Sequence, residues 1–277
     1  MKKPIHPTAL PVLTVAAGAV GALLRLWLLS SLSEERLLKA WHPAAILSGL
    51  LAITVIAGLF LFTRPLKGQG KYRVNFPSSI PAAVCCALAG LAMFLRGMGL
   101  LIGAPAKIYI IAGIACVLCA PCLVLMGMSR WKGQRTVFLL HVVPCAAFAC
   151  LLMIHYQTWT ASPVLHLHVC RLLALAGLML VSYHRAEFDV RLANRRGYAF
   201  LNLVTMFFCL LAIPEGDGLF FLVMAAWLFT NQCALTIFRQ RRPAPKEAEA
   251  AEAAPAEAPA QEPAAEVTPA EPGQEEV

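Results

Sequence analysis

Eight apolar runs, each long enough to cross a lipid bilayer as a helix, occupy most of the chain before residue 239. A helix needs about 20 mostly apolar residues to cross the ~30 Å hydrocarbon core. The hydrophobic fraction of 59% also exceeds the roughly one-half that is usual in soluble domains. We therefore predict an all-α, polytopic integral membrane helix bundle whose main partner is the lipid bilayer. The predicted spans are residues 8–30, 43–63, 79–103, 106–129, 136–157, 163–184, 197–214 and 218–238.

The Lys and Arg residues fall mainly on alternate connections between the predicted spans. Seventeen of the 23 lie at the N-terminus, in the second, fourth and sixth loops, or after the last span; three lie in the other loops and three inside spans. Short loops that are rich in Lys and Arg stay in the cytoplasm. This distribution predicts a multi-pass protein of the cell membrane with both termini cytoplasmic, in agreement with an even number of spans.

The C-terminal segment differs in composition from the rest of the chain. Nine of the 15 acidic residues follow Arg242, and the segment consists mainly of Ala, Glu and Pro without aromatic residues. Such a sequence cannot bury enough apolar surface to offset the entropy cost of ordering. We predict a transmembrane domain over residues 1–240 and a disordered, acidic cytoplasmic tail over 241–277. A tail of this kind also suits recruitment of a cytoplasmic partner, so a non-catalytic membrane scaffold is one candidate function.

Three arginines lie inside apolar spans: Arg25, Arg96 and Arg171. At 1.5 Å per residue they lie roughly 8, 10 and 12 Å below the predicted outer boundary, so three helices place guanidinium groups in one layer. Charges within the membrane commonly mark function, and guanidinium groups bind carboxylates and phosphates. No acidic residue lies within a predicted span, so we expect no ion pairing there beyond partial neutralisation by Glu34 and Glu35. The alternative is that each arginine extends to the outer interface.

Arg25, Arg96 and Arg171 thus form a predicted binding site for a small anionic solute, in a permease or solute-binding membrane protein. Replacing each singly with Gln is expected to abolish binding. Near Arg96, the step from Gly99 to Gly103 is a G-x-x-x-G pattern, which predicts close helix packing.

Histidines on the fifth and sixth spans favour a second candidate, a haem-binding redox protein. Only a short loop joins these spans, so we expect antiparallel neighbours with His155 close to His166 or His168. His141 and His184 then lie toward the inner side. Histidine pairs at two depths suit bis-histidine haem ligation. However, His141 and His155 are ~21 Å apart along one helix and His166 and His184 ~27 Å along the other, a mismatch for two stacked haems.

Cys116, Cys119 and Cys122 form the densest thiol cluster, with spacings that place them along one side of a helix. Soft ligands of this type suit Cu(I) or Zn(II), so they are alternative metal ligands. Forming thiolates in an apolar layer opposes this unless the metal is present. The other interpretation is that the ten cysteines are small apolar residues between helices.

Motifs of several other functional classes are missing. The sequence has no Ser-His-Asp order, phosphate-binding glycine loop, HExxH motif or paired carboxylates, so no catalytic residue is predicted and we do not expect an enzyme. The basic loops carry few aromatic residues and follow membrane ends, so we expect no nucleic-acid binding. The two acidic residues between the last two spans, Glu215 and Asp217, are predicted to form a tight, outward-facing turn.

The composition of the tail leads to a first testable prediction. Deletion of residues 243–277 is expected to leave membrane insertion and folding intact, because a segment without large apolar residues contributes no packed core. The measurement is the amount of folded protein recovered from the membrane fraction, relative to the full chain. Loss of inserted protein in the truncated form would contradict the prediction.

Overall fold

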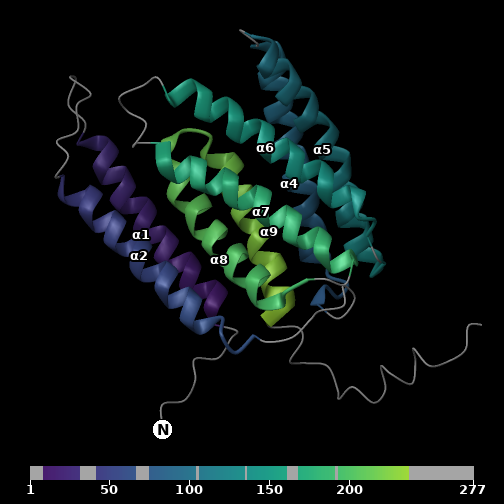
Figure 1. The fold of residues 1–277 in the computed structure, drawn as a ribbon, viewed down its shortest axis with the longest axis horizontal. Coiled ribbons are helices and arrows are strands. Elements are labelled where there is room, and N and C mark those ends of the chain that lie inside the picture. Colours follow the sequence, from purple (N-terminus) through teal and green to yellow (C-terminus); the bar gives the residue numbers. More distant parts are fainter. Residues whose placement is uncertain are drawn as a thin grey trace, which may run out of the picture. The chain divides into compact units, whose positions relative to one another are not determined.

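The computed structural model describes residues 9–31, 42–66, 75–103, 106–134, 136–160, 168–190 and 193–236, which form a helical bundle (Figure 1). Eight of its helices are long and apolar enough to cross a membrane, and no β-strand occurs in these ranges. The predicted all-α, multi-pass architecture is thereby confirmed. The elements are α1 (Leu10–Ser30), α2 (Pro43–Phe62), α4 (Ile80–Ile102), α5 (Lys107–Lys132), α6 (Leu139–Thr160), α7 (Val169–Val190), α8 (Arg195–Ala212), the 3-10 turn η2 (Ile213–Glu215) and α9 (Gly218–Thr236).

The chain divides into two units, residues 1–241 and residues 242–277. Every described residue belongs to the first unit. The predicted disordered tail lies outside the described residues, and the orientation of the termini stays a prediction.

Helix α8 is the centre of the bundle. It packs against α1, α7 and α9, and most of its residues are buried. Successive helices α4, α5, α6 and α7 pack as neighbours, and α9 returns to pack on α4. Helix α2 packs mainly on α1 at one edge of the bundle and is largely exposed (Figure 1). The polar side chains of α7, α8 and α9 are therefore enclosed by more apolar helices.

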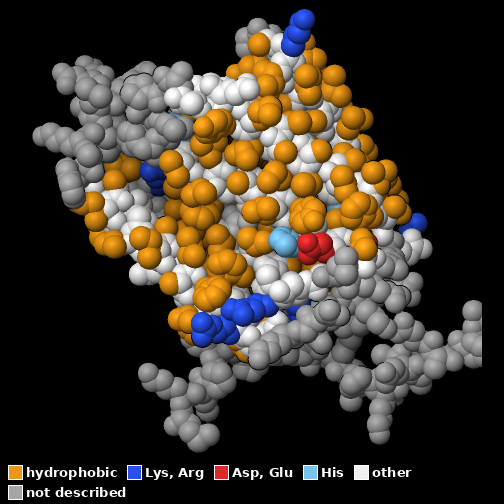
Figure 2. All heavy atoms as spheres, viewed as in Figure 1, with side chains coloured by type: hydrophobic (Ala, Val, Ile, Leu, Met, Phe, Trp, Pro, Cys, Tyr) orange, Lys and Arg blue, Asp and Glu red, His pale blue; other side chains and the backbone are white. Residues whose placement is uncertain are grey.

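Large hydrophobic side chains cover much of the outside of the bundle. Figure 2 shows hydrophobic side chains spread over most of the described part of one face. Ile53 of α2, Leu23 of α1 and Leu118 of α5 are 67%, 66% and 58% exposed. Apolar surface on this scale is rare on soluble monomers and is what contact with lipid requires.

Helix ends follow from the local sequence. Pro43 and Pro81 lie in the first turns of α2 and α4, where the missing N–H costs no helical hydrogen bond. The side chain of Asn194 caps α8 by accepting hydrogen bonds from the backbone N–H groups of Arg196 and Gly197. Gly133 follows α5 with φ +66°, a left-handed conformation that glycine adopts without steric cost.

A row of small residues on α4 faces a matching row on α5, and we call this contact the α4–α5 seam. The residues recur every seven positions, which returns to the same helix face after two turns. They pair in antiparallel order as Ala83 with Gly127, Gly90 with Ala120, and Gly97 with Gly113. A Cβ atom at Gly90 would lie 2.9 Å from the carbonyl oxygen of Ala120, and one at Gly97 would lie 2.8 Å from that of Gly113. The two backbones can approach this closely because no side chain separates them.

The predicted G-x-x-x-G contact at Gly99 and Gly103 is wrong. A Cβ atom at Gly99 would meet nothing within 4 Å, and one at Gly103 would meet only the carbonyl oxygen of Gly99 in its own helix. The seam uses Gly97 instead, directly beside Arg96. The seven-residue row therefore fixes the part of α4 that carries this arginine.

The seam predicts different outcomes for one substitution at two positions of α4. Gly90→Ala is expected to lower the free energy of unfolding by about 1–3 kcal/mol, because the new methyl group collides with backbone and the helices must separate. Gly99→Ala is the matched control and is expected to be neutral or stabilising by up to about 1 kcal/mol. Thermal unfolding of the purified proteins in the same detergent measures both. Equal loss from the two variants would show that the seam does not hold α4 against α5.

Candidate functional site

The three arginines predicted from the sequence meet at the end of the bundle where η2 joins α8 to α9. The Nε of Arg25 donates a hydrogen bond to Oε1 of Glu215 at 2.9 Å, and Nη1 of Arg96 donates to Oδ1 of Asp217 at 2.8 Å. Nη2 of Arg171 forms an ion pair with the other carboxylate oxygen of Asp217. We call these five residues the Asp217 cluster. It ties α1, α4 and α7 to one short connection.

The expectation that ion pairing cannot neutralise these arginines is wrong. The connection does turn tightly, with Gly216 at φ +123°, where a side chain would be strained. However, Glu215 and Asp217 on either side of this glycine turn their carboxylates toward the arginines. The side chains of Glu215 and Arg25 are 1% and 7% exposed, and that of Arg171 is 9% exposed. Burial to this degree means that Arg25 and Arg171 are enclosed by protein.

Aromatic and imidazole rings surround the other side of the Asp217 cluster. The guanidinium carbon of Arg171 lies 5.2 Å from the centre of the Trp159 ring. That indole is stacked between His155 and His168, with ring centres 4.8 Å and 3.9 Å away. Nη2 of Arg96 lies 3.1 Å from Nε2 of His155, and since a guanidinium can only donate, His155 accepts at this atom. The rings hold both arginines in place without adding negative charge.

In the Asp217 cluster, three guanidinium groups face two carboxylates. These charged groups differ in burial. Arg96 and Asp217 have side chains that are 24% and 26% exposed, whereas Arg25 and Glu215 are enclosed. Arg96 and Asp217 are therefore the more accessible charged groups of the cluster.

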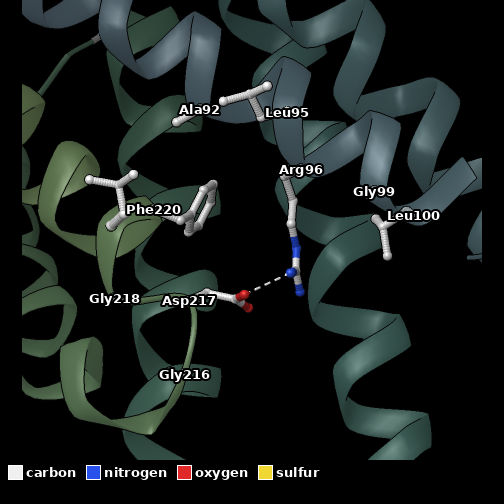
Figure 3. A pocket seen from close by; sticks show the side chains of 10 residues that line it. Ala92, Leu95, Arg96, Gly99, Leu100, Gly216, Asp217, Gly218 and Phe220 are labelled. Carbon is white, nitrogen blue, oxygen red and sulfur yellow. Dashed lines mark hydrogen bonds and ion pairs between the residues drawn. The ribbon is translucent and has the colours of Figure 1, made fainter. Parts of the chain in front are cut away.

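A pocket of about 530 Å³ lies beside Arg96 and Asp217 (Figure 3). Among the described residues that line it, these two alone are charged. Figure 3 shows the Arg96 side chain extending from α4 to Asp217, with Phe220 on the far side of the space. The other lining residues are Ala92, Leu95, Gly99, Leu100, Gly216, Gly218 and Leu219. A mostly apolar pocket with one charged pair suits an apolar molecule that carries a charge.

A second buried polar cluster lies at the opposite end of α7. Nε2 of His141 is 2.9 Å from Oγ1 of Thr136 and 3.2 Å from Oδ2 of Asp189, and all three side chains are nearly fully buried. We call Thr136, His141 and Asp189 the Asp189 cluster. As expected, His141 lies at the end of the bundle remote from Arg25, Arg96 and Arg171. Its partner there is the carboxylate of Asp189 and not a second histidine. His184 instead pairs with Glu187 one turn along its own helix, at 2.9 Å.

Two arginines that we expected in loops are buried within helices near this second cluster. Arg130 lies in α5 and Arg185 in α7, and they are 1% and 0% exposed. Their guanidinium carbons lie 5.1 Å and 5.3 Å from the centre of the same ring, Phe76. Arg185 also lies 5.7 Å from the Trp227 ring centre. The spans predicted to end at residues 129 and 184 continue to Lys132 and Val190 because these charges are covered by protein.

Those residues of the haem and metal alternative that the structure describes do not gather into a ligand set. The indole ring of Trp159 fills the space between His155 and His168, where a haem would have to lie. His166 lies outside the described residues. Within the described ranges, no group of three or more His, Cys, Asp and Glu side chains is placed to hold a metal ion.

The candidate thiols are packing residues of the bundle. All ten cysteines are free, and Cys116 and Cys119 are fully buried whereas Cys122 is partly exposed. Cys116 lies at the α4–α5 seam. A Cβ atom added at Gly97 would lie 3.0 Å from the Cβ atom of Cys116. A small side chain is needed at such a position.

Sequence reasoning missed the two carboxylates that organise the site. Glu215 and Asp217 looked like residues of an exposed turn, because the direction of a turn side chain is set by the elements around it. The signal that points to them is charge balance: three arginines at one depth need counter-charges, and few acidic residues lie outside the tail. Comparisons of the chain with protein-family models, curated proteins and solved structures each find no match.

The buried pair of Arg25 and Glu215 gives a stability prediction. Glu215→Gln is expected to lower the free energy of unfolding by about 3–5 kcal/mol, because the buried guanidinium loses its counter-charge. Arg25→Gln combined with Glu215→Gln is expected to recover most of that loss. A double-mutant cycle of thermal unfolding measures the coupling. Additive losses in the double variant would mean that the two residues do not act as a pair.

Proposed function

We propose that this multi-pass membrane protein is a permease or solute-binding protein for an anionic solute, and that the solute is a small monoanion with an apolar body. The observation that carries the proposal is the accessible guanidinium of Arg96 in a mostly apolar pocket, beside two further arginines. If both termini are cytoplasmic, as the charge distribution predicts, the pocket lies on the outer side.

In this proposal the three arginines have different roles. Arg96 contacts the anion directly, since it lines the pocket. Asp217 orients Arg96 and Arg171 and offsets part of their charge, which favours a monoanion over a dianion. Arg25 is enclosed with Glu215 and contributes through the position of the connection rather than through contact.

Buried polar side chains along α7, α8 and α9 support transport in addition to binding. Asn202 donates hydrogen bonds to the carbonyl oxygen of Leu228 at 2.9 Å and to Oε1 of Gln232 at 3.1 Å. Asn231 is fully buried, and its amide forms no hydrogen bond with any described residue. Polar groups that are buried without partners are costly and commonly mark a path for water or solute. These residues, with the Asp189 cluster beyond them, would offer a solute polar contacts deeper in the bundle.

The proposal predicts selective stabilisation by octanoate. Octanoate is expected to raise the thermal unfolding midpoint of the purified protein, because a ligand that binds the folded state stabilises it. Octylammonium and 1-octanol, which share the apolar chain but not the negative charge, are expected to have little effect. Arg96→Gln is expected to remove the octanoate response.

Lys107→Gln is the matched control, since Lys107 is exposed at the same end of the bundle and does not line the pocket. It is expected to respond to octanoate as the unmodified protein does. Stabilisation of Arg96→Gln equal to that of the unmodified protein, or equal stabilisation by octylammonium, would refute the anion site. Octanoate uptake into proteoliposomes then separates a permease from a binding protein.

A further inference from the structure

Two arginines from different helices share one aromatic ring at the end of the bundle opposite the Asp217 cluster. Phe60 lies in the last turns of α2, Arg64 follows this helix, and Arg196 lies in the first turn of α8. The guanidinium carbons of Arg64 and Arg196 are 5.5 Å and 5.0 Å from the centre of the Phe60 ring. Phe200, one turn along α8 from Arg196, contacts Phe60 edge-on at 5.9 Å and joins α2 to α8. The ring therefore brings both positive charges to the same part of the bundle surface.

Neither arginine has a counter-charge among the described residues. Arg64 and Arg196 form no ion pair with any of them, in contrast to the arginines of the Asp217 cluster. The acidic residues near this end of α7, Glu187 and Asp189, contact His184 and His141 instead. Two like charges near one ring repel each other, so an anion that reaches both would be bound favourably.

The surface next to these arginines is apolar and suited to a lipid chain. Phe60 and Leu61 of α2 are 46% and 54% exposed, and Ile53, about two turns earlier, is 67% exposed. Figure 2 shows basic side chains gathered at the lower edge of the face, directly below a hydrophobic surface. A phospholipid matches this arrangement, with its acyl chains against α2 and its phosphate at the end of the helix.

We infer that Arg64 and Arg196, held by Phe60, form a binding site for the headgroup phosphate of an anionic phospholipid. Basic sites between transmembrane helices on the cytoplasmic side bind anionic headgroups, and the cytoplasmic leaflet is rich in such lipids. This end of the bundle is the one that the positive-inside rule predicts to be cytoplasmic. The site is separate from the pocket at Arg96 and does not rest on the proposed transport function.

The test is native mass spectrometry of the purified protein titrated with phosphatidylglycerol or phosphatidylcholine. Phosphatidylglycerol is expected to bind more tightly, and Arg64→Gln or Arg196→Gln to weaken it roughly fivefold each, as expected for one basic residue near a headgroup. Lys132→Gln is the matched control: it removes an exposed positive charge at the same end of the bundle, and Lys132 forms no cation–π contact with any described residue. It is expected to leave phosphatidylglycerol binding unchanged.

Phe60→Leu separates a built site from general attraction to basic loops. It keeps every charge and much of the apolar surface, yet it is expected to weaken phosphatidylglycerol binding because the two arginines lose their common support. Equal affinities of Phe60→Leu, Arg64→Gln and the unmodified protein would refute the site. Displacement of the lipid by millimolar inorganic phosphate would also refute it, by showing a site for free anions. Tighter lipid binding after deletion of residues 243–277 would mean that the acidic tail is the occupant.

Discussion

The carboxylate of Asp217 is the contact on which the arrangement at its end of the bundle depends. It pairs with Arg96 of α4 and Arg171 of α7, and Glu215 two residues earlier pairs with Arg25 of α1. An uncompensated guanidinium inside a membrane is costly, so each of these helices is stable in its place only with its counter-charge present. A connection of a few residues between α8 and α9 thus fixes three helices that are distant in sequence.

Polarity in this bundle is concentrated inside α7, α8 and α9, while the surrounding helices face lipid. Arg171 near the start of α7 belongs to the Asp217 cluster, and Asp189 near its end belongs to the second cluster. The two lie 18 residues apart, or roughly 27 Å along a helix, which is close to the thickness of the hydrocarbon core. Helix α7 therefore carries a charged group near each of its ends. An internal solute would meet charge at both ends and neutral polar groups, such as Asn202 and Asn231, between them.

Several features were predictable because they follow from length and depth alone. The eight spans follow from the thickness of the bilayer, and the common layer of Arg25, Arg96 and Arg171 follows from the helical rise. Features that depend on tertiary contacts were not predictable in this way. The direction of the Glu215 and Asp217 side chains is one example. The burial of Arg130 and Arg185 is another: a span was assumed to end at its first charge, whereas Phe76 and the surrounding helices cover both groups.

The α4–α5 seam illustrates the same limit at the level of packing. The spacing of Gly99 and Gly103 predicts a helix contact through these two glycines. In the structure, α4 instead contacts α5 through Gly and Ala residues that recur every seven positions on both helices. Either pattern places small residues on one helix face, and a single sequence does not say which face meets a neighbour. The matching row on α5, at Gly113, Ala120 and Gly127, is the additional signal that selects the seam.

Burial, more than charge, separates the arginines that can bind an anion from those that cannot. Arg130 and Arg185 lie against aromatic rings but are enclosed, so an external ligand cannot reach them without rearrangement. Arg25 is enclosed with its carboxylate. Arg96, Arg64 and Arg196 combine a fixed guanidinium with access from outside, the first beside a pocket and the other two beside exposed apolar helix surface. Because a fixed guanidinium has already lost its side-chain freedom, an anion that binds it causes little further ordering. The proposed solute site and the proposed headgroup site lie at opposite ends of the helices, so the two ligands would not compete with each other.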